Sequence, residues 1–183
     1  MFWDLDSVTP RAGTYGTWGV ALRTALGELL GVEVELTAVM NEHTFRRTVQ
    51  ARFEGPGDVP ASWETVVVRD LKERADVEIR SRLFERVVST RDQCDRLVVT
   101  IVSADNGFAK DMRWSMEQGC AAWVIGTRKG GEAQALRRWE RSTLVREVGS
   151  GLLLTDGFGT SPGAYNPEED TVRRVFSRVV LPP

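Results

Sequence analysis

Two aspartates stand at the end of the first apolar segment of this chain. Residues 1–8 read MFWDLDSV, a strand pattern that ends at Asp4 and offers Asp6 two positions later. Ligands of open α/β sheets bind outside the carboxyl ends of the strands, so Asp4 is expected to face a reaction site. Alternation places Asp4 and Asp6 on one side of an extended chain, and like charges so close require a cation, a shared proton or water. A strand end with solvated acids is the other interpretation that this segment allows.

Two further aspartates follow the same logic. Asp76 lies near the start of a helical pattern over residues 71–88, and Asp105 ends the most apolar strand pattern, residues 96–105. Because the βα junctions of a parallel sheet lie at one edge, the fold can bring Asp76 and Asp105 to Asp4. Clustered carboxylate oxygens are natural ligands of Mg²⁺ or Mn²⁺. Two such ions about 4 Å apart suit hydrolysis of a phosphodiester bond, one activating water and the other stabilising the leaving oxygen.

The segments that must position these acids alternate between strand and helix spacing. This rhythm predicts right-handed βαβ units, and therefore an α/β fold with a central, mainly parallel sheet and helices on both faces. Residues 32–40 alternate apolar and acidic side chains, as in a strand near a sheet edge. The valine run in 64–70 indicates a strand covered on both faces. Strands are expected at 1–8, 32–40, 64–70, 96–105, 121–127, 144–148 and 152–155. Helices are expected at 18–30, 44–53, 71–88, 108–118 and 133–139. Loops are expected at 9–16 and 157–167, and either a helix or a strand at 172–181. The apolar side of helix 71–88 is expected to comprise Val77, Leu83, Phe84 and Val87.

Composition and charge exclude several classes of protein. A hydrophobic content of 42% and a charged content of 27% are near the averages of globular proteins, which argues against disorder and against a membrane span. The net charge of −2 gives no overall attraction to nucleic acid, so an RNA site would need a local patch of Lys and Arg. The first residues lack a leader pattern, and a cytoplasmic protein is expected. Cys94 and Cys120 lack metal-ligand spacing and are expected to be reduced, buried thiols, and His43, the single histidine, to be a surface residue.

Four segments of the chain resemble the NYN domain family, which are PIN-like metal-dependent ribonucleases. Residues 2–8 (FWDLDSV) are similar to the family's opening strand and D-x-x-N turn, and residues 72–77 (KERADV) to its lysine-containing loop before an acid at a helix start. Residues 102–108 (VSADNGF) resemble its S-G-D-S-D-F element, and residues 118–126 the helix-to-strand passage that follows. The order and spacing of these segments match the family over residues 1–150.

The resemblance implies a PIN-like three-layer fold and a metal-dependent ribonuclease that acts on RNA with Mg²⁺ or Mn²⁺. Residues 1–150 would form the catalytic domain. Residues 151–183 would form an extension packed on the same domain, or a contact for a homodimer. Asp4, Asp76 and Asp105 would be the catalytic metal ligands, and Ser103 would support the turn that precedes Asp105.

Three positions depart from the pattern of the family. Ser7 stands where the family has an asparagine, and its hydroxyl has a shorter reach. Gly107 replaces the second acid of the S-G-D-S-D-F element, and Ser81 replaces a further acid of the following helix. The metal site is therefore expected to hold three acids, with Asp6 or Asp111 as substitutes for the missing ones. One-metal activity, altered substrate choice and lost activity all stay open.

Basic and polar side chains beside these acids are expected to bind the RNA. Lysine contacts to phosphates set the register of a nucleic acid without reading its bases. Arg80, Arg82 and Arg113, by contrast, are expected on solvated helix faces. The expected substrate-binding residues are Ser7, Lys72, Ser103, Asn106, Lys110 and Lys129, with Arg128 beside the last of them.

Two other functions account for parts of the same pattern. Residues 4–8 (DLDSV) also resemble the D-x-D-x-[TV] motif of HAD-like phosphatases, in which Asp4 would attack phosphorus and Asp6 would act as acid and base. The acid pair that such enzymes need after a later strand is missing between residues 121 and 154, and Asp76 would have no role. The two missing acids of the NYN pattern instead favour a catalytically inactive PIN-like module that binds RNA or a protein.

Overall fold

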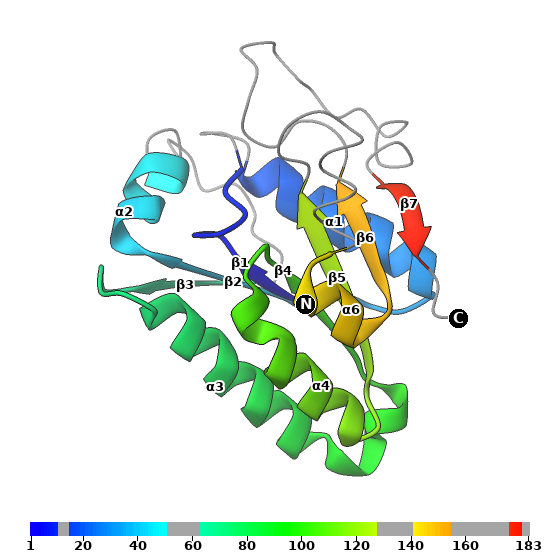
Figure 1. Ribbon diagram of the computed structural model, residues 1–183. Coiled ribbons are helices and arrows are strands. Elements are labelled where there is room, and N and C mark those ends of the chain that lie inside the picture. Colours follow the sequence, from blue (N-terminus) through cyan, green and yellow to red (C-terminus); the bar gives the residue numbers. More distant parts are fainter. Residues whose placement is uncertain (11–14, 51–62, 128–140, 155–175, 181–183) are drawn as a thin grey trace.

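A largely parallel sheet forms the centre of the molecule (Figure 1). The computed structural model describes residues 1–10, 15–50, 63–127, 141–154 and 176–180. Within these ranges a seven-stranded sheet has the order β3-β2-β1-β4-β5-β6-β7, in which only β7 is antiparallel to its neighbour. The strands are β1 (Phe2–Asp4), β2 (Leu36–Asn41), β3 (Trp63–Val68), β4 (Val98–Val102), β5 (Ala121–Thr127), β6 (Gly151–Leu154) and β7 (Phe176–Val180).

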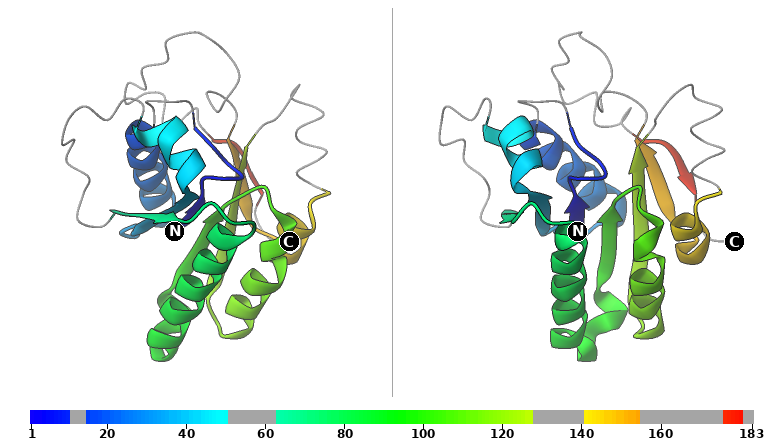
Figure 2. Two further views of the ribbon diagram at one scale, coloured as in Figure 1. Left: turned by 90° about the vertical axis from the view of Figure 1, so that its left-hand side faces the viewer. Right: turned by 60° about the vertical axis from the view of Figure 1, so that its left-hand side comes forward.

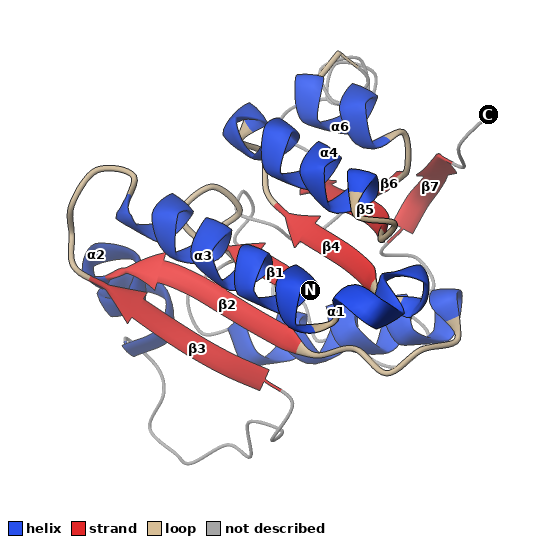
Figure 3. Cartoon of the chain, turned by 90° about the horizontal axis from the view of Figure 1, so that it is seen from below, coloured by secondary structure: helices blue, strands red, loops and turns tan. Residues whose placement is uncertain are grey.

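Helices cover both faces of this sheet, as the views in Figures 2 and 3 show. α1 (Tyr15–Leu30) packs on one face, whereas α3 (Arg74–Ser89), α4 (Ala109–Glu117) and α6 (Thr143–Val148) pack on the other. The predicted three-layer α/β fold with a central, mainly parallel sheet is therefore confirmed. The shorter elements are α2 (Glu42–Phe45), the π-helical turn η1 (Arg46–Gln50), and the 3-10 turns η2 (Arg91–Arg96) and η3 (Asn106–Phe108).

The central strand β1 is buried on both faces. Because successive side chains of a strand point to opposite faces, Phe2 joins the core beneath α3 and α4, and Trp3 joins the core beneath α1. The indole N–H of Trp3 donates a hydrogen bond to the carbonyl oxygen of Val8 at 2.9 Å. This bond folds the segment after β1 back onto the strand, so Asp4 ends β1 at a turn rather than within a longer strand.

The places of β2 and β3 in the sheet are the reverse of those predicted. β2 lies between β1 and β3 and is almost wholly buried, because the acidic residues Glu33 and Glu35 precede the strand rather than lying in it. Among the strands that the structure describes, β3 lies at the edge of the sheet and pairs only with β2, and Val67 is 41% exposed. Val66 and Val68 are half-buried against the α3 face. The valine run therefore marks an edge strand with one covered face.

The segment at residues 144–148 forms the helix α6 instead of the predicted strand. Leu144, Val145 and Val148 are buried on one side of the helix; their spacing of one and three residues is that of a helix face and not the alternation of a strand. The other predicted strands are present. The segment 172–181, for which either a helix or a strand was expected, contains the strand β7. α2 and η1 take up the first part of helix 44–53. Helix 133–139 and loop 157–167 lie outside the described residues, as do residues 11–14 of loop 9–16.

The remaining expectations concern single residues. Cys94 and Cys120 are buried, free thiols, as predicted. Burial and the neighbouring Cys94 raise the pKa of Cys120 to about 12, so this thiol stays protonated. His43 is exposed on α2, as predicted. Among the described residues, no helix combines the length and the apolar character that crossing a membrane requires.

The buried side of α3 differs from the predicted one at two positions. The buried residues follow one another at four-residue intervals, the spacing of one helix face. Val77 is 49% exposed and Phe84 is 54% exposed, so the prediction was wrong for both. The ring of Phe84 instead stacks on Trp114 of α4, with 5.0 Å between ring centroids. The buried residues are Ala75, Ile79, Leu83 and Val87.

Leu83 and Phe84 provide a test of this helix face. Leu83 is 1% exposed, so Leu83→Ala is expected to lower the free energy of unfolding by about 2–5 kcal/mol by leaving a cavity. Phe84→Ala removes mainly one exposed ring contact and is expected to cost less than about 1.5 kcal/mol. Urea denaturation measures both changes. A larger loss for Phe84→Ala than for Leu83→Ala would contradict the assigned face.

Candidate active site at the carboxyl edge of the sheet

The strand order reverses between β1 and β4. From β1 the chain adds β2 and β3 on one side, and β4, β5 and β6 on the other. In such sheets the crevice at the carboxyl ends of the two central strands is the usual place for a ligand. Trp3 pairs with Val102, so the next residues along the two strands, Asp4 and Ser103, lie side by side at this edge.

Asp4 is a buried carboxylate held by two hydrogen bonds. It is 1% exposed. Its Oδ2 accepts a hydrogen bond from the Ser103 hydroxyl at 2.7 Å, and its Oδ1 accepts one from the backbone N–H of Ser7 at 3.2 Å. Burial raises the pKa of Asp4 to about 6; these hydrogen bonds oppose the rise, and the negative charges of Asp76 and Asp6 add to it. Asp4 therefore carries a charge that its surroundings only partly compensate.

Ser7 and Ser103 join the loops that follow β1 and β4. The Ser7 Oγ accepts a hydrogen bond from the backbone N–H of Ala104 at 2.8 Å, and lies 3.4 Å from the Ser103 Oγ. The Ser103 Oγ also accepts one from the backbone N–H of Asp105 at 3.0 Å. Ser103 is 2% exposed, and its hydroxyl is already hydrogen-bonded to Asp4 and to the backbone of Asp105. It therefore supports the turn, as predicted, and is poorly placed to contact a substrate.

Asp105 and Asp76 are the more accessible acids of the site. Asp105 is exposed at the N-cap of η3, where its Oδ1 accepts a hydrogen bond from the backbone N–H of Gly107 at 2.7 Å. Asp76 is half-buried in the first turn of α3. Burial and the negative charge of Asp105 raise the pKa of Asp76, while the cation of Arg80 lowers it. The charges of acids from β1, α3 and the end of β4 thus act on one another at one edge of the sheet.

The two acids named as substitutes have different surroundings. Both carboxylate oxygens of Asp6 accept the backbone N–H of Asn41, at 3.2 and 3.3 Å, which ties the loop after β1 to the end of β2. Asp6 is exposed and its charge raises the pKa of Asp76 and Asp4. Asp111 instead forms an ion pair with Arg80 at 3.1 Å. Asp6 is therefore part of the acidic group, whereas Asp111 is bound to a cation of its own.

The donors of this site suit a hard cation in kind. Carboxylate and hydroxyl oxygens are the ligands of Mg²⁺ and Mn²⁺ in proteins. Among the described residues, however, no three His, Cys, Asp or Glu side chains are grouped so that they could hold one ion. Mg²⁺ commonly binds one or two carboxylates and keeps several water ligands. Asp105 with Asp76 is the accessible pair that fits this mode, with Asp4 and Asp6 contributing charge around it.

The predicted substrate-binding residues do not all converge on the acids. The Asn106 Oδ1 accepts hydrogen bonds from the Ser142 hydroxyl at 2.7 Å and from the backbone N–H of Leu144 at 3.1 Å, so this oxygen caps α6. Lys72 is exposed and lies 3.7 Å from Glu73. Lys110 is exposed in the first turn of α4, whereas Lys129 and Arg128 lie outside the described residues.

Arg80 is a residue of this site that sequence reasoning missed. It lies on α3 one helical turn after Asp76, and its cation lowers the pKa of that acid. The Arg80 Nη2 lies 3.4 Å from the carbonyl oxygen of Gly107, and the guanidinium carbon lies 5.3 Å from the centre of the Phe108 ring. The interval of four between an acid and an arginine on one helix was the available signal.

The buried Asp4 predicts how stability depends on pH. A carboxyl whose pKa is raised on folding, here from 3.8 to about 6, binds its proton more tightly in the folded state. The free energy of unfolding in EDTA is therefore expected to fall as the pH rises from about 4 to about 6, and to level off above that, with Asp4 accounting for up to about 3 kcal/mol.

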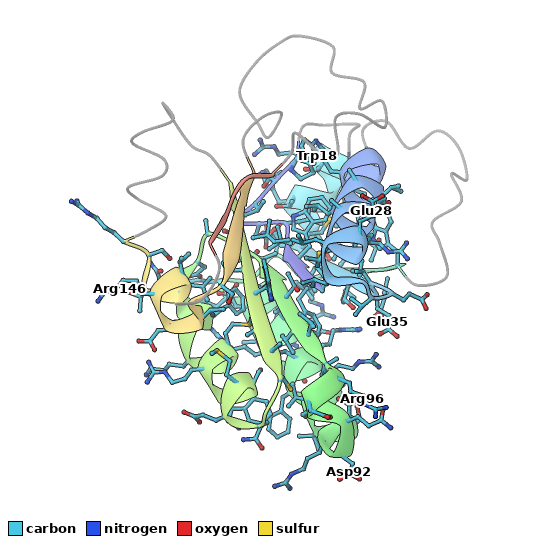
Figure 4. All side chains as sticks on the ribbon, turned by 90° about the vertical axis from the view of Figure 1, so that its right-hand side faces the viewer. Trp18, Glu28, Glu35, Asp92, Arg96 and Arg146 are labelled. Atoms are coloured by element: carbon cyan, nitrogen blue, oxygen red, sulfur yellow. The ribbon has the colours of Figure 1, made fainter. Side chains whose placement is uncertain are left out.

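Urea denaturation between pH 4 and pH 7 measures this dependence. Asp4→Asn is expected to flatten the decline and to equal or exceed the wild type in stability at pH 7. Asp92→Asn is the control, because Figure 4 places Asp92 at the opposite, amino edge of the sheet, in η2. A decline that Asp4→Asn leaves unchanged would contradict the burial of a charged group at this position.

Comparisons with protein-family models, with curated proteins and with solved structures found no match to this chain. The resemblance of residues 1–150 to the NYN domain family therefore rests on the motifs themselves and stays a prediction.

Proposed function

We propose that this protein is a ribonuclease that hydrolyses phosphodiester bonds with the help of Mg²⁺ or Mn²⁺. The observation that supports the proposal is that Asp4, Asp76 and Asp105, three acids from distant parts of the chain, lie at the carboxyl edge of the sheet, where the charge of Asp76 acts on Asp4 and that of Asp105 acts on Asp76. Negative charges that raise the pKa of Asp4 and of Asp76 favour a bound cation, because a cation relieves their repulsion. RNA is proposed as the substrate because the acidic motifs of the chain resemble those of the NYN domain family, whose members are ribonucleases.

The acids have different tasks in this proposal. Asp76 and Asp105 are accessible and would hold the cation, which when bound lowers the pKa of a water molecule and neutralises charge on the phosphate. Asp4 is 1% exposed, so it would contribute its negative charge to the site without contacting the cation directly. Ser103 and Ser7 fix the two oxygens of Asp4 and the backbone beside Asp105.

Exposed basic side chains near this edge suit contact with a phosphate backbone. Lys72 precedes α3 and Lys110 lies in the first turn of α4, and both helices begin at the same edge of the sheet as the acids. Because the net charge of the chain is −2, such contacts must be local to attract RNA. Their contribution to binding is expected to weaken as salt is added.

The burial of Asp4 argues against the HAD-like alternative. A nucleophilic aspartate must bring one carboxylate oxygen to the phosphorus atom of the substrate. The Oδ2 of Asp4 is instead bonded to the Ser103 hydroxyl at 2.7 Å, and the side chain is almost inaccessible. The ribonuclease proposal also gives Asp76 a role, which the HAD-like alternative does not.

The proposal is tested by offering the purified protein labelled single-stranded RNA, structured RNA and p-nitrophenyl phosphate, with Mn²⁺, Mg²⁺ or EDTA. RNA cleavage is expected only with metal, and it should fall by about 100-fold in Asp105→Asn, because one of the accessible carboxylates is lost. Asp92→Asn, which is remote from the edge, should cleave at the wild-type rate.

Other outcomes would point elsewhere. Turnover of p-nitrophenyl phosphate that disappears in Asp4→Asn would favour the HAD-like phosphatase. Silence with every substrate, together with no heat of Mn²⁺ binding in calorimetry, would contradict both enzymatic functions and leave the module that binds without cleaving.

A further inference from the structure

The guanidinium of Arg80 is held in a fixed position between α3 and α4. Its Nε donates to the Asp111 Oδ2 at 3.1 Å, and its Nη2 donates to the carbonyl oxygen of Gly107 at 3.4 Å. The plane of Phe108 lies beneath it, with the guanidinium carbon 5.3 Å from the ring centre. The side chain is 35% exposed, so Arg80 is neither free in solvent, as predicted for it, nor buried out of reach.

This fixed cation adjoins the acids of the site. A Cβ atom at Gly107 would lie 3.1 Å from the Arg80 Nη2 and 3.2 Å from the Asp105 Oδ1. The guanidinium and the Asp105 carboxylate therefore approach the same point of the backbone, and the absence of a side chain at Gly107 keeps the space between them open. The positive charge of Arg80 also lowers the pKa of Asp76.

Arg80 has hydrogen-bond donors to spare in this position. A guanidinium has five N–H donors, and the two described bonds use the Nε and one of the Nη2 hydrogens. Among the described residues, the other donors of Arg80 have no hydrogen-bond acceptor. A guanidinium fork with open donors matches the paired oxygens of a phosphate.

Arg82 provides the contrast on the same helix. It is bound by two carboxylates, Glu64 and Glu78, each at 2.6 Å, and it contacts none of the acids at the carboxyl edge. The two arginines therefore differ in their charged partners: Arg82 pairs with two carboxylates, whereas Arg80 pairs with one carboxylate and one backbone carbonyl, beside the acids of the site.

We propose that the Arg80 guanidinium binds a phosphate group of the RNA substrate beside Asp76 and Asp105. This inference rests on the proposed function and deepens it by assigning the contact that brings the phosphate to the acids. Asp111 and Gly107 anchor the guanidinium, so it does not need to be ordered when the substrate arrives. A fixed cation at this point also offsets the charge that the phosphate gains as water attacks it.

The proposal is tested by the binding of labelled single-stranded RNA in EDTA, measured by fluorescence anisotropy over a range of salt concentrations. Arg80→Gln is expected to weaken binding by about tenfold, the value of one charged hydrogen bond. It should also lower the dependence of log Kd on log salt by roughly one phosphate contact, about 0.7 for a single strand. Arg80→Lys keeps the charge without the fork and is expected to fall between Arg80→Gln and the wild type.

Two control variants separate phosphate binding from a purely structural ion pair. Arg82→Gln, which lies outside the site, should bind RNA within about twofold of the wild type. Asp111→Asn loosens the anchor but leaves the guanidinium in place, so it should weaken binding clearly less than Arg80→Gln does. If Arg80 only linked α3 to α4, Asp111→Asn would be as harmful as Arg80→Gln. That result, or unchanged binding by both Arg80→Gln and Arg80→Lys, would overturn the inference, as would an absence of RNA binding by the wild type.

The same variants distinguish this inference from the proposed function. A wild type that cleaves RNA, with Arg80→Gln cleaving and binding equally well, would overturn the role of Arg80 and leave the ribonuclease intact. A wild type that binds RNA through Arg80 without cleaving it with any metal would support the phosphate contact and contradict the ribonuclease.

Discussion

The hydrogen bond between the Ser103 hydroxyl and the buried carboxylate of Asp4 joins the ends of β1 and β4, the two strands between which the strand order of the sheet reverses. Removing a carboxylate from water is costly unless hydrogen bonds or opposite charges compensate it. The Ser7 amide and the Ser103 hydroxyl supply part of this compensation, and they come from the loops after β1 and β4. Because the carboxylate of Asp4 needs these hydrogen bonds, it constrains the backbone of both loops, including the segment beside Asp105.

The compensation that Asp4 receives from the protein is incomplete, as its raised pKa shows. Asp76 and Asp6 add negative charge to the same edge, and Asp105 adds it next to Asp76. An arrangement of this kind is unfavourable for folding and is typical of functional sites, where perturbed carboxylates gather around a ligand. A divalent cation and the anchored guanidinium of Arg80 are the complementary charges in our account.

The sequence predicted the parts of the fold in which one local pattern dominates. β4 and β5 are buried runs of apolar residues, and the stop of α4 at Gly119 coincides with a left-handed backbone, φ 93°, that favours glycine. Edge and interior could not be told apart for β2 and β3, because alternation is similar in both. α6 was predicted to be a strand because six residues are too few to separate the period of a helix from that of a strand.

Asp4 and Asp105 were found because a strand end is a local signal. The anchoring of Arg80 between α3 and α4 and the Asn106 cap were not found, since the partners in these contacts lie 27 to 38 residues away.

Anomalous diffraction from crystals soaked in Mn²⁺ tests the central claim, that the acids at the carboxyl edge of β1 and β4 bind a divalent cation. We predict a peak beside the carboxylates of Asp76 and Asp105, and its disappearance in crystals of Asp105→Asn. No peak at this edge in crystals that bind Mn²⁺ elsewhere, or a peak that Asp105→Asn leaves in place, would contradict it.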